Sequence, residues 1–127
     1  MKRRDQRIKV MTCLYQYFLT NRSLDDLFDD NLDIDDKESI AFIVEETVST
    51  VNNYDYLRGE IEKNLVETWE FDRLGFIEQS LLLMSANEIL IDETDKGIVI
   101  NEAVEIAKKY CDDDAPKLIN GVLDKLC

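Results

Sequence analysis

The stretch LGFIEQSLLLMSANEIL, residues 74–90, indicates the fold class of the chain. Within it, Leu74, Ile77, Leu81 and Met84 recur at intervals of three or four residues. This spacing places apolar side chains on one face of an α-helix. We therefore expect a helix through this stretch that ends near residue 90.

One charged residue interrupts this apolar face. Glu88 follows Met84 by four residues, and a carboxylate that is buried needs hydrogen-bond donors. One interpretation is that the helix has ended or turned into solvent before Glu88. The other is a structural buried carboxylate that accepts backbone N–H groups at a nearby helix start, for which residues 100–102 are the candidate.

Helical spacing also recurs on both sides of this stretch. The further segments are residues 8–19, 24–28, 40–51, 54–65, 100–110 and 118–126. With 4 Gly and 1 Pro, the chain lacks the turn residues of a β-sandwich or barrel. Its 127 residues suffice for one sizeable core. We therefore expect an all-α fold of about seven helices in a single domain, residues 1–127.

Local signals mark the starts of several helices. Ser23 and Asp114 are predicted N-caps, and Pro116 is tolerated in the first turn of the last helix. Carboxylates around Asp36 favour a helix start after them. Gly121 lies inside the last predicted helix, where Gly costs about 1 kcal/mol relative to Ala. We expect the close approach of another backbone to compensate.

Sequence features also bear on the compartment. No apolar run approaches the ~20 residues that span a membrane, and no apolar signal segment follows the charged N-terminus. We therefore expect a cytoplasmic protein. Cys13, Cys111 and Cys127 are far apart and form no CxxC pair, so neither a disulfide framework nor a structural zinc site is expected.

Several classes of catalytic site are excluded by residue type. The chain has no His, which removes the commonest general base and metal ligand, together with Ser–His and Cys–His nucleophile arrangements. It also has no glycine-rich phosphate loop. We expect neither an enzyme nor a bound cofactor or metal.

Charge is distributed unevenly along the chain. The formal net charge is −13, but residues 1–16 carry a net +4. At helical spacing Arg3, Arg4 and Arg7 lie on the side where Met11 and Leu14 also point. Their guanidiniums could bind phosphates at a helix start that overhangs the core. The alternative is an ordinary solvated terminus.

Four motifs carry a resemblance to a known family. They are WEFDRL (69–74), ANEIL (86–90), VINEAVEIAKKY (99–110) and KLINGVLDK (117–125). In this order and spacing they resemble the signature of the NusB family, whose arginine-rich first helix the N-terminal segment also resembles. The resemblance spans the chain and is most specific over residues 69–126.

The resemblance implies a fold and a function. The fold would be a compact bundle of two packed helical subdomains. The function would be that of a transcription antitermination factor that binds boxA-type single-stranded RNA together with NusE, a small-subunit ribosomal protein. This complex would load onto RNA polymerase and suppress termination on ribosomal RNA operons. No catalysis is implied.

The resemblance also implies site residues, and the sequence departs from the family at some of them. The implied RNA-binding residues are Arg3, Arg4, Arg7, Asp114, Lys117 and Leu118, and Tyr15 and Glu78 are implied to contact RNA or NusE. Leu118 stands where many family members have Phe, which removes a stacking ring. Asp5 interrupts the basic run, and Asn87 stands where an aromatic residue is common.

Three functional alternatives follow. The first is an RNA-binding factor in which the N-terminal guanidiniums and the turn at Lys117 gather into one cationic platform. The second is a NusB-fold protein–protein interaction module with weak or no RNA binding. The third is an accessory domain of an RNA-modifying enzyme. The chain could be a monomer or a homodimer.

Overall fold

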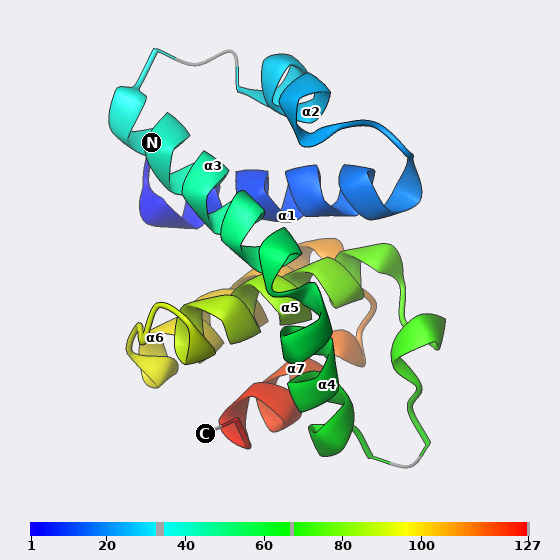
Figure 1. The fold of residues 1–127 in the computed structure, drawn as a ribbon. Coiled ribbons are helices and arrows are strands. Elements are labelled where there is room, and N and C mark those ends of the chain that lie inside the picture. Colours follow the sequence, from blue (N-terminus) through cyan, green and yellow to red (C-terminus); the bar gives the residue numbers. More distant parts are fainter. Residues whose placement is uncertain (33–34, 67, 127) are drawn as a thin grey trace.

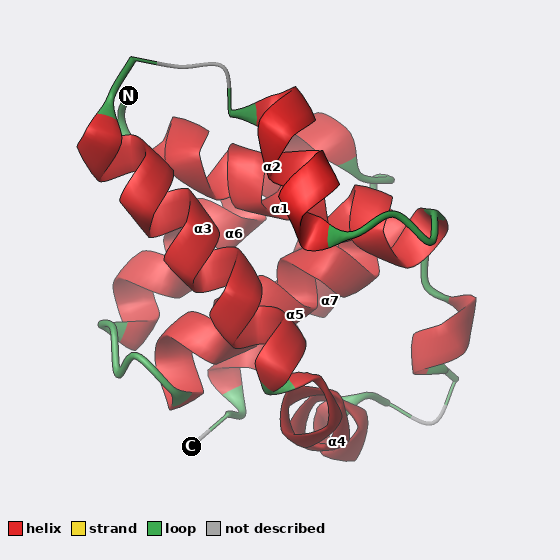
Figure 2. Ribbon diagram, turned by 45° about the horizontal axis from the view of Figure 1, so that its top comes forward, coloured by secondary structure: helices red, strands yellow, loops and turns green. Residues whose placement is uncertain are grey.

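The structure is a computed structural model that describes residues 1–32, 35–66 and 68–126, and in these ranges the regular structure is entirely helical (Figure 2). The helices are α1 (Arg3–Leu19), α2 (Leu24–Asn31), α3 (Lys37–Asn52), α4 (Tyr54–Asn64), η1 (Phe71–Arg73), α5 (Phe76–Leu90), α6 (Lys96–Tyr110) and α7 (Ala115–Asp124). The expected all-α fold is therefore confirmed, with seven α-helices and one 3₁₀ turn in the described ranges.

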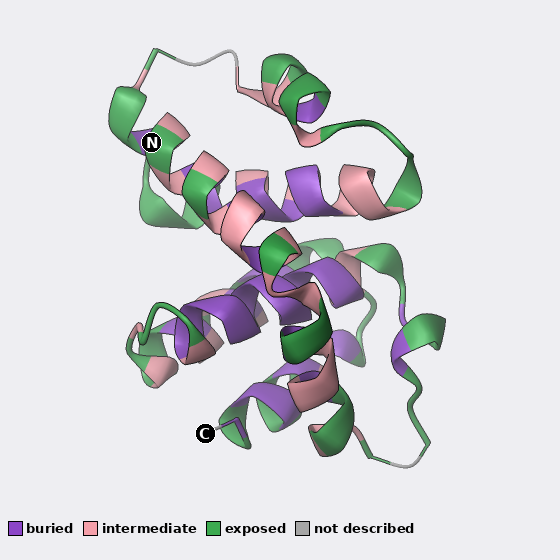
Figure 3. Cartoon of the chain, in the orientation of Figure 1, coloured by how far each residue is buried: buried purple, intermediate pink, exposed green. Residues whose placement is uncertain are grey.

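Helix α5, the stretch from which the fold class was predicted, is the centre of the molecule. Every residue from Gln79 to Ile89 is buried, and Figure 3 shows α5 as an almost continuous buried segment. It packs against α1, α3, α4, α6 and α7. A helix that is covered on all sides is apolar on more than one face, and each polar side chain that it buries needs hydrogen-bond partners.

The other helices form two groups around α5 (Figure 1). In the first group α1 packs against α2 and α3, and in the second α6 packs against α7. Both groups contact α5, which joins them into one core that includes Leu14, Ile43 and Ile119. Helix α1 runs antiparallel to α5, so the start of α1 lies beside the end of α5 (Figure 1).

The predicted helix starts are partly confirmed. The Ser23 hydroxyl accepts a hydrogen bond from the N–H of Asp26 at 3.2 Å, and the Asp36 carboxylate caps α3 through the N–H of Ser39, also at 3.2 Å. Asp114 precedes α7 but makes no side-chain cap hydrogen bond, because its backbone is already in the helical region. Asp114 is therefore the N-cap residue by position, as predicted, but the expectation that its side chain caps the helix is wrong.

The explanation offered for Gly121 is also wrong. A Cβ atom built on Gly121 would meet nothing within 4 Å, so no backbone approaches it closely. The residue is exposed on α7 and faces open space.

Two further sequence features have a structural counterpart. Cys13 is buried and Cys111 half-buried, and both are free thiols, whereas Cys127 lies outside the described residues. Burial raises the pKa of Cys13 to about 11. In the part of the chain that the structure describes, no helix is long and apolar enough to cross a bilayer.

Candidate nucleic-acid interface

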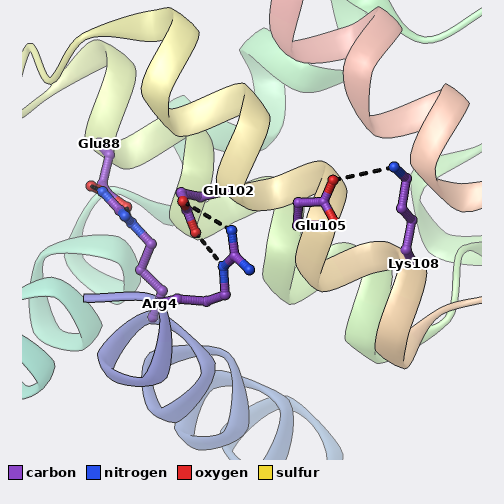
Figure 4. Close-up of polar contacts among 6 residues, drawn as sticks. Arg4, Glu88, Glu102, Glu105 and Lys108 are labelled. Carbon is purple, nitrogen blue, oxygen red and sulfur yellow. Dashed lines mark hydrogen bonds and ion pairs between the residues drawn. The ribbon is translucent and has the colours of Figure 1, made fainter. Parts of the chain in front are cut away.

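The basic start of α1 is held by carboxylates from two other helices. Arg4 reaches from α1 to Glu102 on α6, where its Nε and Nη2 atoms donate hydrogen bonds to the carboxylate at 2.7 and 3.2 Å (Figure 4). The Arg4 side chain is 51% exposed. The hydrogen bonds from Arg4 hold the pKa of Glu102 below its ordinary value. Arg4 is therefore accessible to a phosphate, but only in competition with Glu102.

Arg7 makes a buried version of the same contact. Its Nε and Nη2 atoms donate to Glu88 at 2.8 and 2.9 Å, and both side chains are less than a tenth exposed. Hydrogen bonding to Glu88 raises the pKa of Arg7 above its ordinary value. Bidentate pairing of this kind satisfies the buried carboxylate.

This contact settles the role of Glu88 and changes that of Arg7. Glu88 is a structural buried carboxylate, as one of the two interpretations held, but the predicted donors at residues 100–102 are wrong, because its donor is a guanidinium from α1. Arg7 does not overhang the core: in this structure it is buried and already paired, so no phosphate can reach it. It fixes the start of α1 against the end of α5.

Arg3 completes the first basic region, which we define as Arg3 and Arg4. The Arg3 guanidinium lies 3.8 Å from the centre of the Phe42 ring on α3, in a cation–π contact. The residue is exposed. Because an aromatic face leaves the hydrogen-bond donors of the guanidinium unused, Arg3 can still bind a phosphate.

The remaining predicted residues lie around the start of α7. Asp114, Lys117 and Leu118 line a hollow of about 340 Å³, and Asp114 and Leu118 also line a neighbouring hollow of about 170 Å³ that includes Glu78. The start of α5 and the start of α7 therefore form one surface. The Cys111 thiol lies beside Glu78, and burial together with this carboxylate raises the pKa of Cys111 to about 12.

The two regions are separated along α5. Glu78 and Glu88 lie ten residues apart in α5, which corresponds to about 15 Å along the helix axis. The first basic region lies at the Glu88 end and the hollow with Lys117 at the Glu78 end. The expectation of a single cationic platform is therefore wrong, because α1 and α5 run antiparallel and α7 begins at the opposite end of α5. Only a strand that runs along the molecule could touch both.

Tyr15 lies towards the Glu78 end of the molecule and not at the start of α1. It is half-buried on α1, eleven residues beyond Arg4, or about 16 Å along the helix. This displacement is directed towards the start of α5, where Glu78 lies (Figure 1). Tyr15 is therefore well separated from the first basic region along α1.

Some residues of this surface could not be found by sequence reasoning. Glu102 was considered only as part of a helix start, and its pairing with Arg4 joins residues 98 positions apart. Trp69 lines both hollows, although it belongs to a segment between helices that has no periodicity. Asn87, where an aromatic residue was noted as usual, is buried and accepts a hydrogen bond from the Ser49 hydroxyl at 3.2 Å.

Comparison with curated proteins gives relatives that match almost the whole chain. The transcription antitermination protein NusB of Sulfurovum sp. is 38% identical over 126 residues, which cover 98% of this chain and 96% of the relative. The protein of the same name from Exiguobacterium sp. is 34% identical over 127 residues, which cover 99% and 97%.

Solved structures share the fold. The antitermination factors NusB and NusE have been solved in complex with dsRNA, and one chain of that structure matches with a TM-score of 0.87 and 26% identity over 98% of this chain and 94% of that one. A chain in the crystal structure of a plectonemic RNA supercoil matches with a TM-score of 0.89 and 27% identity, over 98% and 92%.

A family model gives the same assignment. The NusB family model matches residues 4–127, a range that contains both regions described above except Arg3. This match and the relatives of 34–38% identity each cover nearly the full length of the chain. The chain therefore belongs to the NusB family.

Proposed function

We propose that this chain is a transcription antitermination factor that binds boxA-type single-stranded RNA together with NusE, loads onto RNA polymerase and suppresses termination on ribosomal RNA operons. The observation that carries the proposal is the match over almost the whole chain to transcription antitermination proteins NusB. The similarity to the structure of NusB and NusE with dsRNA supports RNA and NusE as partners. The protein acts as a regulator in the cytoplasm and not as an enzyme.

The surface divides into contacts of different chemistry. Arg3 and Arg4 bind phosphates at one end, and Lys117 binds a phosphate at the other, because guanidinium and ammonium groups are the usual partners of the RNA backbone. Arg7 supports this surface from within. When Arg4 binds a phosphate, it gives up its ion pair with the Glu102 carboxylate. The loss of this pair reduces the net free energy gained when RNA binds.

The carboxylate and apolar residues contact bases or the protein partner. Asp114 is exposed and can accept hydrogen bonds from the amino group of a base. Leu118 is half-buried and packs against an unstacked base. Tyr15 and Glu78 contact RNA or NusE at the same end of the molecule.

A second candidate function is a NusB-fold protein–protein interaction module with weak or no RNA binding. Two observations favour it: Arg4 and Arg7 are both paired with carboxylates, and the net charge of −13 repels nucleic acid outside the basic regions. In this alternative, NusE binds the chain in the absence of RNA, and RNA adds nothing to the complex.

Fluorescence anisotropy of a labelled boxA-like single-stranded RNA distinguishes the RNA-binding factor from the protein–protein interaction module. The RNA is titrated with the protein, with and without cognate NusE, at several salt concentrations. We expect NusE to raise the affinity and Lys117→Glu to lower it. Lys37→Glu, an exposed lysine on α3 with the same change of charge, is the control. Equal affinities of the two variants, or no gain from NusE, would contradict the proposal.

A further inference from the structure

The larger hollow, of about 340 Å³, is lined by side chains beyond those that the family resemblance implies to bind RNA. It lies between the end of α4, the segment that follows α4, and α7. The lining residues that bear on its chemistry are Trp69, Asp114, Lys117, Leu118, Gly121 and Lys125. Its volume falls at the lower end of the range for small-molecule sites, about 300–1,000 Å³. One flat ring system with a substituent would fill it.

Trp69 is the unusual member of this lining. Its side chain is 40% exposed, although neighbouring Phe71 is only 1% exposed and anchors the segment in the core. The backbone N–H of Trp69 donates to the carbonyl of Val66 at 2.9 Å, which closes a turn next to the ring. Trp69 lines both this hollow and the smaller one. A large aromatic side chain held at the surface in this way is available for stacking.

The charges among the described lining residues of the hollow favour an anionic ligand. Its two cations are Lys117 and Lys125, and among the described residues neither ammonium group has a hydrogen-bond or ion-pair partner. Asp114 is the one carboxylate among the lining residues described.

Gly121 leaves room in the hollow for a ligand. A Cβ atom there would point into open space, and Gly in this helix costs about 1 kcal/mol relative to Ala without any packing benefit. Because Gly121 lines the hollow, a side chain at this position would occupy part of the ligand volume. Gly121 therefore leaves this part of the hollow open to a ligand that approaches the helix backbone.

We propose that this hollow binds one unstacked nucleotide of the RNA, with its base stacked on Trp69 and its phosphate between Lys117 and Lys125. Leu118 provides an apolar wall for the base but no ring, so the stacking ring comes from a different segment of the chain. Stacking of a base on an aromatic side chain contributes about 1–3 kcal/mol and tolerates every base. The inference rests on the proposed RNA-binding function.

The experiment uses the fact that the chain has a single Trp. A boxA-like single-stranded RNA is titrated into the full protein, and intrinsic fluorescence is recorded in parallel with the anisotropy of the same RNA carrying a label. We expect quenching of Trp69 that follows the anisotropy curve. Trp69→Leu should weaken binding roughly five- to hundredfold, as the loss of one stacked base predicts. Trp69→Phe should recover most of the affinity.

Two further variants separate binding from folding. Tyr56→Leu removes an aromatic side chain on α4 that is 51% exposed and outside the hollow, and it should leave RNA affinity unchanged. Gly121→Gln fills the hollow. Because Gln is a better helix former than Gly, this variant should melt at the same or a higher temperature while binding RNA at least about fivefold more weakly. If the hollow had only a structural role, Gly121→Gln would not combine an unchanged or higher melting temperature with weaker RNA binding.

The outcomes distinguish this inference from the proposed function. If the RNA binds but Trp69 fluorescence does not change and Trp69→Leu and Gly121→Gln bind normally, the hollow site is refuted while the RNA-binding function stands. If these variants lose NusE binding and keep RNA binding, the hollow belongs to the protein partner and the inference is equally refuted. If the unaltered protein binds no RNA, both proposals fail.

Discussion

Replacing Glu88 by Gln tests the central packing contact of the molecule. The substitution keeps the shape of the side chain but removes the paired counter-charge of the buried Arg7 guanidinium, and it sets an amide NH₂ against one of the guanidinium donors. Both side chains are less than a tenth exposed, and the two hydrogen bonds measure 2.8 and 2.9 Å. Breaking a buried pair from one side costs about 3–5 kcal/mol, out of a typical total of about 5–15 kcal/mol.

Urea denaturation followed by circular dichroism measures this loss. The slope of unfolding free energy against urea should stay constant while the midpoint falls, and the melting temperature should drop by about 10–20 °C. Glu102→Gln is the matched control, because it removes the same chemical group from the more exposed pair with Arg4 and should cost little. The paired replacement Arg7→Met with Glu88→Leu should recover much of the loss. A loss of less than about 1 kcal/mol in Glu88→Gln would refute the reasoning, because it is too small for an uncompensated buried charge.

Three other substitutions give independent tests. Burial beside Asp92 raises the pKa of Glu46 from 4.5 to about 8, so the folded chain binds this proton more tightly than the unfolded chain does. The unfolding free energy should therefore fall as pH rises between these values and level off above them, and Glu46→Gln should remove that fall in urea denaturation across pH. Glu102→Gln should release Arg4 and raise the affinity for boxA-like RNA roughly two- to fivefold in anisotropy titrations, and unchanged or weaker binding would contradict the competition between carboxylate and phosphate. Ser23→Ala removes the cap of α2 and should destabilise the protein by about 1 kcal/mol in thermal melts, whereas Ser23→Gly should cost only a few tenths.

The helices could be predicted because their signal is local. Apolar spacing depends only on residues within a few turns, and it located seven helices whose boundaries the structure extends at some ends and shortens at others by a few residues. The Ser23 cap was predictable for the same reason, since its hydroxyl binds an N–H three residues away. Asp114 belongs to a residue type that commonly caps helices. Whether its side chain caps α7 depends on its backbone conformation, which has no sequence signal.

Tertiary contacts between distant residues were not predictable in this way. The periodicity correctly placed Arg7 on the face of Met11 and Leu14, both of which are buried, and it identified Glu88 as a carboxylate in need of donors. No local sequence signal links Arg7 to Glu88, because the two residues are 81 positions apart. The sequence therefore predicted a different partner for each. For the same reason the two basic regions were expected together, although their separation is set by the antiparallel packing of α1 and α5.

Terminator read-through in vitro tests the central functional claim most directly. A ribosomal RNA leader with boxA is transcribed by RNA polymerase ahead of a terminator, with this protein, cognate NusE and the accessory transcription factors supplied in purified form. Full-length transcript should increase only when both this protein and NusE are present, and the increase should disappear when boxA is scrambled or when the protein carries Lys117→Glu. Read-through that is the same with scrambled boxA, or that does not depend on this protein, would contradict the account.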